Sequence, residues 1–172
     1  MARGIDTKPY LEWLDGVESA VVTPNLPHGG VAVRMACILV ELGEAFGETA
    51  VEPHVRISAD TILLPDVAFF RLDALAAVPP HERLLPAIPA EVVVEVRSPN
   101  DRPGFRDEKI RRYLAWGAKL VLDVDPSKRT VVAHVAGGTR AFDNGDRFSH
   151  EAVPWLHFEL ARIFARLDLL ER

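Results

Sequence analysis

Apolar residues recur at helical spacing in two segments of the chain. In residues 31–46 they fall three or four positions apart, at Val31, Met35, Ile38, Leu39 and Leu42. This spacing predicts an amphipathic helix that ends near Gly43 or Gly47. Residues 105–116 show a second helical pattern, which Gly117 ends.

Shorter stretches predict strands, several of them rich in β-branched residues. They cover residues 19–23, 51–58, 61–64, 67–70, 91–98, 120–124 and 130–135. Pro65 separates two of these pieces, and residues 51–70 predict a hairpin that turns at Ala59-Asp60. The other segments predict a short helix (8–14), a proline-rich surface excursion (71–90), a strand region (148–158) and a terminal helix (160–170).

The order of these elements predicts the fold class. Strand, helix and strand follow one another between Val92 and Val124, which is typical of a parallel pair joined by a crossover helix. The earlier hairpin predicts antiparallel partners for the same sheet. We therefore expect an α/β fold with a mixed β-sheet flanked by helices, and one domain over residues 1–172.

Composition narrows the class of protein. Hydrophobic residues make up 48% of the 172 residues and charged residues 26%, as in an ordinary globular protein. The single cysteine, Cys37, allows no internal disulfide, and we find neither a signal peptide nor an apolar stretch long enough for a bilayer. We therefore expect a cytoplasmic protein without a membrane partner. The net charge of -5 argues against a general nucleic-acid binder but not against a nuclease.

Glu95 is the residue that most strongly suggests chemistry. It lies within a valine-rich strand, where a carboxylate is costly unless a cation, a metal or a set of donors compensates its charge. Alternation along the strand places Glu91, Val93, Glu95 and Arg97 on one face. Glu95 and Arg97 are thus two residues apart on the same side of the strand.

Two further residues could complete a site with Glu95. Asp66 follows Pro65 at the start of a neighbouring strand, and Lys109 lies on the aromatic stripe of the helix over residues 105–116. Two carboxylates from adjacent strands suit Mg²⁺ or Mn²⁺, and a nearby lysine could orient or deprotonate a water and neutralise developing charge. The trio Asp66, Glu95 and Lys109 is typical of a metal-dependent phosphodiesterase site.

Each of the three residues also has a structural explanation. Asp66 could cap a turn, Glu95 could pair with Arg97 or another cation on a sheet edge, and Lys109 could be an ordinary helix lysine. Taken singly, each structural role is the commoner one. Taken together, they would require three unrelated coincidences, which favours the functional interpretation.

The same residues carry a resemblance to a known family. Pro65-Asp66, the run from Val92 to Pro99, the segment from Glu108 to Gly117 and Asp125-Pro126 after a strand resemble the bacterial Uma family. That family consists of restriction-endonuclease-like proteins within the PD-(D/E)XK nuclease superfamily. The resemblance spans residues 10–136, and its combined motifs are more specific than the bare Pro-Asp pair.

The resemblance implies a role for individual residues. Asp66 and Glu95 would bind the metal, Lys109 would be the catalytic lysine displaced from the strand to the helix, and Ser98 would lie at the edge of the site. Arg97 occupies the position where the superfamily usually has lysine. The family's acid after the amino-terminal glycine is shifted here to Glu18, and a one-residue shift on a strand reverses its side. His28, which precedes the long helix, is expected to mark a helix start more than a catalyst.

Other basic residues could contact nucleic acid. Arg97, Arg102 and other arginines cluster around the predicted site and could bind phosphates, although interleaved acids make a solvated surface about equally plausible.

The sequence thus predicts an endonuclease that hydrolyses DNA phosphodiester bonds with Mg²⁺ or Mn²⁺. The alternative is a non-catalytic module that binds nucleic acid or protein and keeps the nuclease fold. Cutting two strands suits a two-fold protein, so a homodimer is a reasonable expectation.

Overall fold

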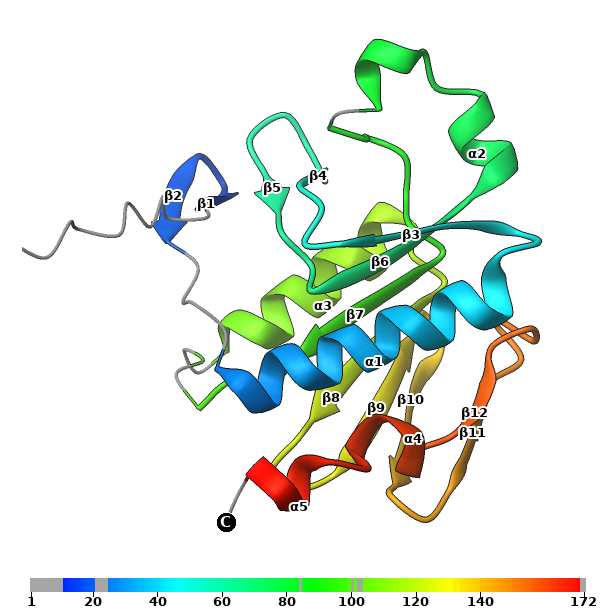
Figure 1. Ribbon diagram of the computed structural model, residues 1–172. Coiled ribbons are helices and arrows are strands. Elements are labelled where there is room, and N and C mark those ends of the chain that lie inside the picture. The colour runs from blue at the N-terminus through cyan, green and yellow to red at the C-terminus, as the bar shows by residue number, and fades with distance from the viewer. Residues whose placement is uncertain (1–10, 21–24, 84, 100, 102–103, 171–172) are drawn as a thin grey trace, which may run out of the picture.

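A six-stranded sheet forms the centre of the protein, with strands in the order β10-β9-β8-β7-β6-β3 (Figure 1). The computed structural model describes residues 11–20, 25–83, 85–99, 101 and 104–170. The strands of the central sheet are β3 (Gly47–Val51), β6 (Val67–Arg71), β7 (Val92–Val96), β8 (Leu120–Asp125), β9 (Thr130–Val135) and β10 (Gly138–Asp143).

The sheet is mixed, as the sequence predicts. β7 and β8 run parallel, with Val93 beside Val121, and α3 (Phe105–Trp116) is the crossover helix between them. The other neighbours in this sheet pair antiparallel. The predicted α/β class with helices flanking a mixed sheet is therefore confirmed.

One face of the sheet packs against α1 (Leu26–Gly43), which crosses it diagonally (Figure 1). Val31, Met35 and Leu39 of this helix are fully buried with Val92 and Val94 of β7. The same core includes residues from the carboxyl-terminal segments. These are β11 (Arg147–Ser149), β12 (His157–Glu159), α4 (Ala161–Phe164) and α5 (Leu167–Leu170).

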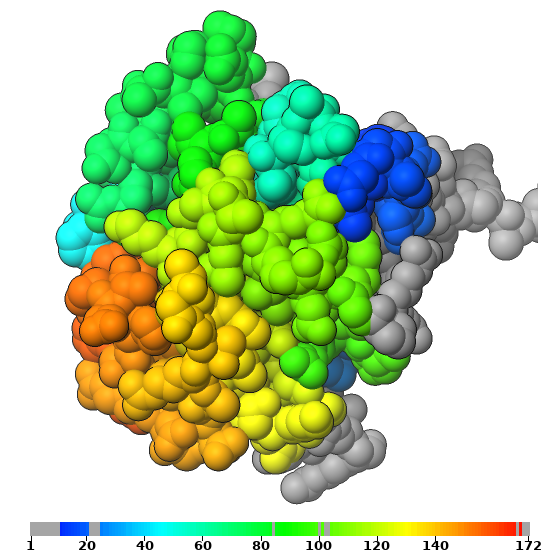
Figure 2. All heavy atoms as spheres, turned by 180° about the vertical axis from the view of Figure 1, so that it is seen from behind, coloured from blue at the N-terminus to red at the C-terminus, as the bar shows by residue number. Residues whose placement is uncertain are grey.

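The opposite face packs against α3. Ile110 and Tyr113 of the helix form a second core with Val93 of β7 and Val121 of β8. A small sheet in the order β2-β1-β5-β4 lies next to this layer. Figure 2 shows its amino-terminal hairpin and the β4–β5 segment side by side, next to α3. These strands are β1 (Leu11–Leu14), β2 (Val17–Ala20), β4 (Val55–Arg56) and β5 (Ile62–Leu63).

α1 is long and apolar enough to cross a membrane, with a mean hydropathy of 1.2 over 18 residues, although we expected no such segment. Length and composition alone give this result, and a core helix of a globular protein satisfies the same criteria. The buried side of α1 against β6 and β7 has the packing of a core helix.

The structure also corrects three local predictions. The part of residues 8–14 that is described forms strand β1, because it pairs with β2 and β5 instead of coiling locally. The single strand expected over residues 51–58 is broken where Glu52 adopts a positive φ of 48° and Pro53 has no N–H to donate. The terminal helix is split into α4 and α5.

The proline-rich stretch over residues 71–90 contains more structure than expected. It begins with α2 (Leu72–Ala76) and continues into a short 3₁₀ helix at Pro80–Glu82. Neither helix has a buried side chain, so the expectation of a surface excursion is met.

Gly47 allows β3 to approach β6 closely. A Cβ at this position would lie 2.2 Å from the backbone O of Phe70 and 2.4 Å from Cζ of Phe69. Gly47→Ala should therefore lower the free energy of unfolding by about 1–3 kcal/mol through overpacking, measured by urea denaturation. Gly137→Ala is the matched control, because a Cβ there meets nothing within 4 Å. Equal stability of the two variants would contradict this account of the β3–β6 contact.

Candidate active site

A buried cluster of charged side chains lies where α3 meets the central sheet and the amino-terminal hairpin. Nζ of Lys109 is 2.8 Å from Oε1 of Glu95 on β7 and 2.8 Å from Oε1 of Glu12 on β1. The relative exposures are 7% for Lys109, 6% for Glu95 and 3% for Glu12. One ammonium group thus compensates two carboxylates that are almost entirely removed from water.

Tyr113 and the backbone complete the cluster. The hydroxyl of Tyr113 donates to Oε1 of Glu95 at 2.8 Å, and the N–H of Leu64 donates to Oε1 of Glu12 at 2.8 Å. Lys109 and Tyr113 are four residues apart on α3, so both side chains point from one face of the helix toward the sheet. Helical spacing and strand alternation therefore deliver donors and acceptors to the same buried point.

Burial controls the electrostatics of this cluster. It raises the pKa of Glu95 to about 7, against the opposing effect of the Lys109 charge. Burial disfavours the ammonium form of Lys109, but the charges of Glu95 and Glu12 keep the pKa of Lys109 above its ordinary value. The pKa of Tyr113 is also raised, by burial and then by Glu95. Lys109 is therefore cationic at neutral pH, and Glu95 can gain or lose a proton there.

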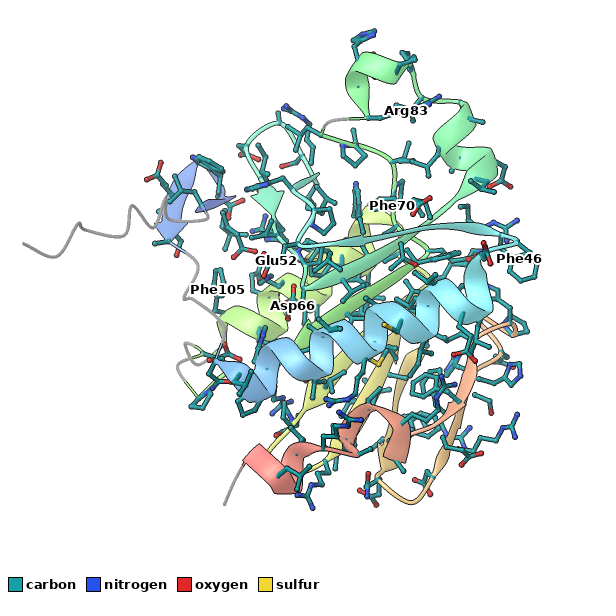
Figure 3. The ribbon with its side chains drawn as sticks, viewed as in Figure 1. Phe46, Glu52, Asp66, Phe70, Arg83 and Phe105 are labelled. Atoms are coloured by element: carbon teal, nitrogen blue, oxygen red, sulfur yellow. The ribbon has the colours of Figure 1, made fainter. Side chains whose placement is uncertain are left out.

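Asp66 lies beside this cluster, just before β6 begins (Figure 3). In the β6–β7 register Val67 faces Val94, so one further step places Asp66 beside Glu95. Oδ2 of Asp66 accepts from the N–H of Val96 at 2.6 Å and is 3.3 Å from Nε2 of His28. Asp66 and Glu95 thus come from neighbouring strands, as the sequence analysis expected, and the register adds that they share one face of the sheet.

His28 occupies the first turn of α1. Its backbone N–H donates to Oδ1 of Asn25 at 2.9 Å, which caps the helix, and its ring contacts Asp66. Burial lowers the pKa of His28, but the hydrogen bond and charge of Asp66 outweigh that effect and raise it above the ordinary value. Sequence reasoning expected a helix-start residue, and the contact with Asp66 adds a link to the site.

Asp123 extends the row of acids across a third strand. It is the parallel neighbour of Glu95 in the β7–β8 register and is 2% exposed. Nη2 of Arg97 lies 2.5 Å from its Oδ2, and Nη1 of Arg106 lies 3.2 Å from its Oδ1. Arg97 therefore pairs with Asp123. Of the two partners that the sequence analysis left open for Glu95, Arg97 or another cation, the structure shows the second, Lys109.

The remaining predicted residues lie outside the cluster or outside the described chain. The backbone N–H of Ser98 donates to Oδ2 of Asp101 at 3.0 Å in the turn after β7. Glu18 is exposed on β2. Arg102 is not among the described residues, so the structure does not test its proposed contact with nucleic acid.

Sequence reasoning missed Glu12, although it is in the same segment as Glu18. The available signal was a glutamate in an otherwise apolar run, Leu11-Glu12-Trp13-Leu14, which is the feature that singled out Glu95. The error had two causes. The pattern of residues 8–14 predicts a helix instead of a strand, and the family resemblance points to the acid after Gly16.

The donor set suits a divalent ion bound mainly by two carboxylates. Among the described residues, Oε2 of Glu95 and Oδ1 of Asp66 receive no hydrogen bond, whereas the other oxygen of each side chain is occupied. Mg²⁺ is commonly held by one or two carboxylates, with water or phosphate as the other ligands. No group of three or more His, Cys, Asp or Glu side chains in the described ranges could hold a metal by itself.

Comparison with known proteins places this chain in a family. Residues 4–161 match the Uma2 family, whose description is "Putative restriction endonuclease". The chain belongs to the Uma2 family. No curated protein is similar enough in sequence to count as a relative of this Uma2 chain.

A solved structure supports the same fold for the Uma2 chain. The crystal structure of a "putative nuclease belonging to DUF820" from Anabaena variabilis aligns with a TM-score of 0.81 at 18% sequence identity. The alignment covers 94% of this chain and 93% of that one. The two proteins share a fold, and the family and the fold together point to a restriction-endonuclease-like nuclease.

The raised pKa of Glu95 predicts a pH-dependent stability difference between the Uma2 chain and its Glu95→Gln variant. Because the folded protein binds the Glu95 proton more tightly than the unfolded chain, the wild type loses stability as pH rises from about 4.5 to about 7. Relative to the variant, this loss should reach about 3 kcal/mol. Urea denaturation across that range measures it.

The exposed Glu18 provides the control for this measurement. Glu18→Gln should show a stability difference from wild type that does not change with pH in the same way. A constant difference for Glu95→Gln would mean that Glu95 is ionised throughout and would contradict the assigned pKa.

Proposed function

We propose that this chain is a divalent-metal-dependent endonuclease that hydrolyses phosphodiester bonds of DNA. One observation carries the proposal: the buried contact of Lys109 with Glu95, on a strand whose neighbour brings Asp66 to the same face. A desolvated ionic cluster seldom stabilises a fold better than apolar packing does, so its presence favours a functional role. The family and the fold independently favour a nuclease.

The metal, Mg²⁺ or Mn²⁺, would be held by Asp66 and Glu95. When bound, it would polarise the phosphodiester and lower the pKa of a coordinated water. One oxygen of each acid is already bound. Oδ2 of Asp66 contacts the N–H of Val96 and the ring of His28. Oε1 of Glu95 contacts the hydroxyl of Tyr113 and the ammonium group of Lys109. Those contacts fix the orientation of the two carboxylates before any ligand arrives.

Lys109 would act as a fixed positive charge. Because its pKa is raised by the two acids beside it, it remains protonated at neutral pH and is poorly suited to remove a proton from water. Of the two roles that the sequence analysis left open, this favours orientation and charge neutralisation. Lys109 would therefore donate hydrogen bonds to the attacking water or to the phosphate.

Glu12 joins the proposed site through Lys109. It shares the ammonium with Glu95, and its other contact is the N–H of Leu64, two residues before Asp66. Glu12 would thus hold Lys109 in place and add negative charge to the region where a cation binds. A homodimer, which would suit the cutting of two strands, remains a prediction.

A nuclease assay with paired variants tests the proposal. Cleavage of plasmid DNA in Mg²⁺ should fall by at least about 100-fold in Glu95→Gln, which keeps the shape of the side chain but removes its charge. Glu12→Gln should also lower the rate, whereas Glu18→Gln, in the same hairpin, should not. Gel analysis of supercoiled, nicked and linear plasmid gives the rates.

Two results would contradict the proposed endonuclease activity. Equal cleavage by wild type and Glu95→Gln would identify a contaminating nuclease. DNA binding without cleavage, together with no binding of Mg²⁺ or Mn²⁺ at millimolar concentration, would support the alternative of a non-catalytic binding module.

A further inference from the structure

The row of acids across β6, β7 and β8 contains one member that is bound differently from the others. Asp66 and Glu95 each keep one oxygen without a hydrogen bond from the described residues, as shown above. Asp123, the third acid of the row, has both oxygens occupied by guanidinium groups. The difference matters because three adjacent carboxylates could otherwise serve more than one metal ion.

The contacts of Asp123 form a closed cluster with Arg97 and Arg106. Nε of Arg97 donates to Oδ1 at 3.1 Å and Nη2 to Oδ2 at 2.5 Å, which is a bidentate pair. Nη1 of Arg106 adds a third bond to Oδ1 at 3.2 Å. The hydrogen bond to Asp123 raises the pKa of Arg97 above its ordinary value, and this effect is larger than the opposing effect of burial.

Additional contacts fix the positions of both arginines. Nη2 of Arg106 donates to the carbonyl oxygen of Val96 at 3.2 Å and also contacts Asp101. Nη1 of Arg97 is 3.7 Å from Oδ2 of Asp125. The side chain of Arg97 is 40% exposed, whereas that of Arg106 is only 13% exposed. Arg97 therefore offers solvent-facing donors two residues after Glu95 on the same side of the strand.

We infer that Asp123 is a positioning residue for Arg97 and Arg106 and not a metal ligand. The site then binds one divalent ion. Where a second ion would otherwise lie, it presents an arginine to the phosphate. This inference rests on the proposed function. A guanidinium group binds phosphate oxygens through paired N–H donors, and its bond to a buried carboxylate limits the orientations it can take. Asp123 thus contributes geometry, while Asp66 and Glu95 contribute ligands.

Metal binding distinguishes this role from that of a ligand. We expect calorimetric titration with Mn²⁺ to give one ion per wild-type chain. Asp123→Asn and Glu95→Gln are matched substitutions at neighbouring positions of the same row. Glu95→Gln should weaken Mn²⁺ binding by at least about tenfold. Asp123→Asn should weaken it much less, because it removes a nearby negative charge but no ligand of the ion.

DNA affinity supplies the second readout. Binding of a fluorescein-labelled duplex, measured by anisotropy with Ca²⁺ in place of Mg²⁺, should weaken several-fold in Asp123→Asn because Arg97 loses half of its bidentate partner. Loss of one negative charge would by itself strengthen binding to DNA, so the two explanations predict opposite signs. Arg111→Gln removes an exposed arginine of α3 that pairs with Glu108, and it shows how much a simple charge change alters DNA affinity.

The outcomes separate this inference from the proposed function. Two Mn²⁺ ions per wild-type chain, or a loss of affinity in Asp123→Asn as large as that in Glu95→Gln, would overturn the role of Asp123 and leave the nuclease proposal intact. Unchanged or tighter DNA binding by Asp123→Asn would also overturn it. No Mn²⁺ binding by the wild type would reject both the inference and the metal-dependent function.

Discussion

The site depends on one interaction, the ammonium group of Lys109 held between the carboxylates of Glu12 and Glu95. Each of these three side chains would be expensive to bury alone, because removing an isolated charge from water costs several kcal/mol. Together with the Tyr113 hydroxyl and the Leu64 N–H, they form a set in which every charge has a partner. The contact also ties β7, α3 and the amino-terminal hairpin to a single point.

The arrangement of the sheet explains why the acids meet there. β6, β7 and β8 are consecutive in the sheet, and the registers place Asp66, Glu95 and Asp123 side by side although they are far apart in the chain. The parallel β7–β8 pair requires a crossover, and α3 provides it on the face that carries these acids. The element that completes the fold therefore also delivers Lys109, Tyr113 and Arg106 to the site.

Many of the helix and strand positions could be predicted from the sequence. Residues 105–116 and 130–135 have the predicted bounds because Gly117 ends the helix and the flanking turns limit the strand. A glutamate among valines was enough to predict that the charge of Glu95 needs a partner, which the structure provides in Lys109, whereas its part in a metal site stays a prediction. The buried contacts of Glu12 and Asp123 were missed because both depend on strand pairing over long distances, which local patterns do not encode. The sequence left open whether Glu95 pairs with Arg97 or with another cation, and the structure pairs it with Lys109, while Arg97 pairs with Asp123 on β8.

The attachment of the amino-terminal hairpin has a further consequence. Glu12 lies on the β1–β2 hairpin, in which no apolar side chain is fully buried. The hairpin is joined to the rest of the protein by the pairing of β1 with β5, by partial packing of Leu14 and by polar contacts such as Arg112 with Asp15. Segments with few buried apolar contacts open at lower free energy than the core does. Partial opening would therefore remove Glu12 and expose Lys109 to solvent while the central sheet stays folded. On mild heating, such a protein would lose its organised ionic centre before it melts.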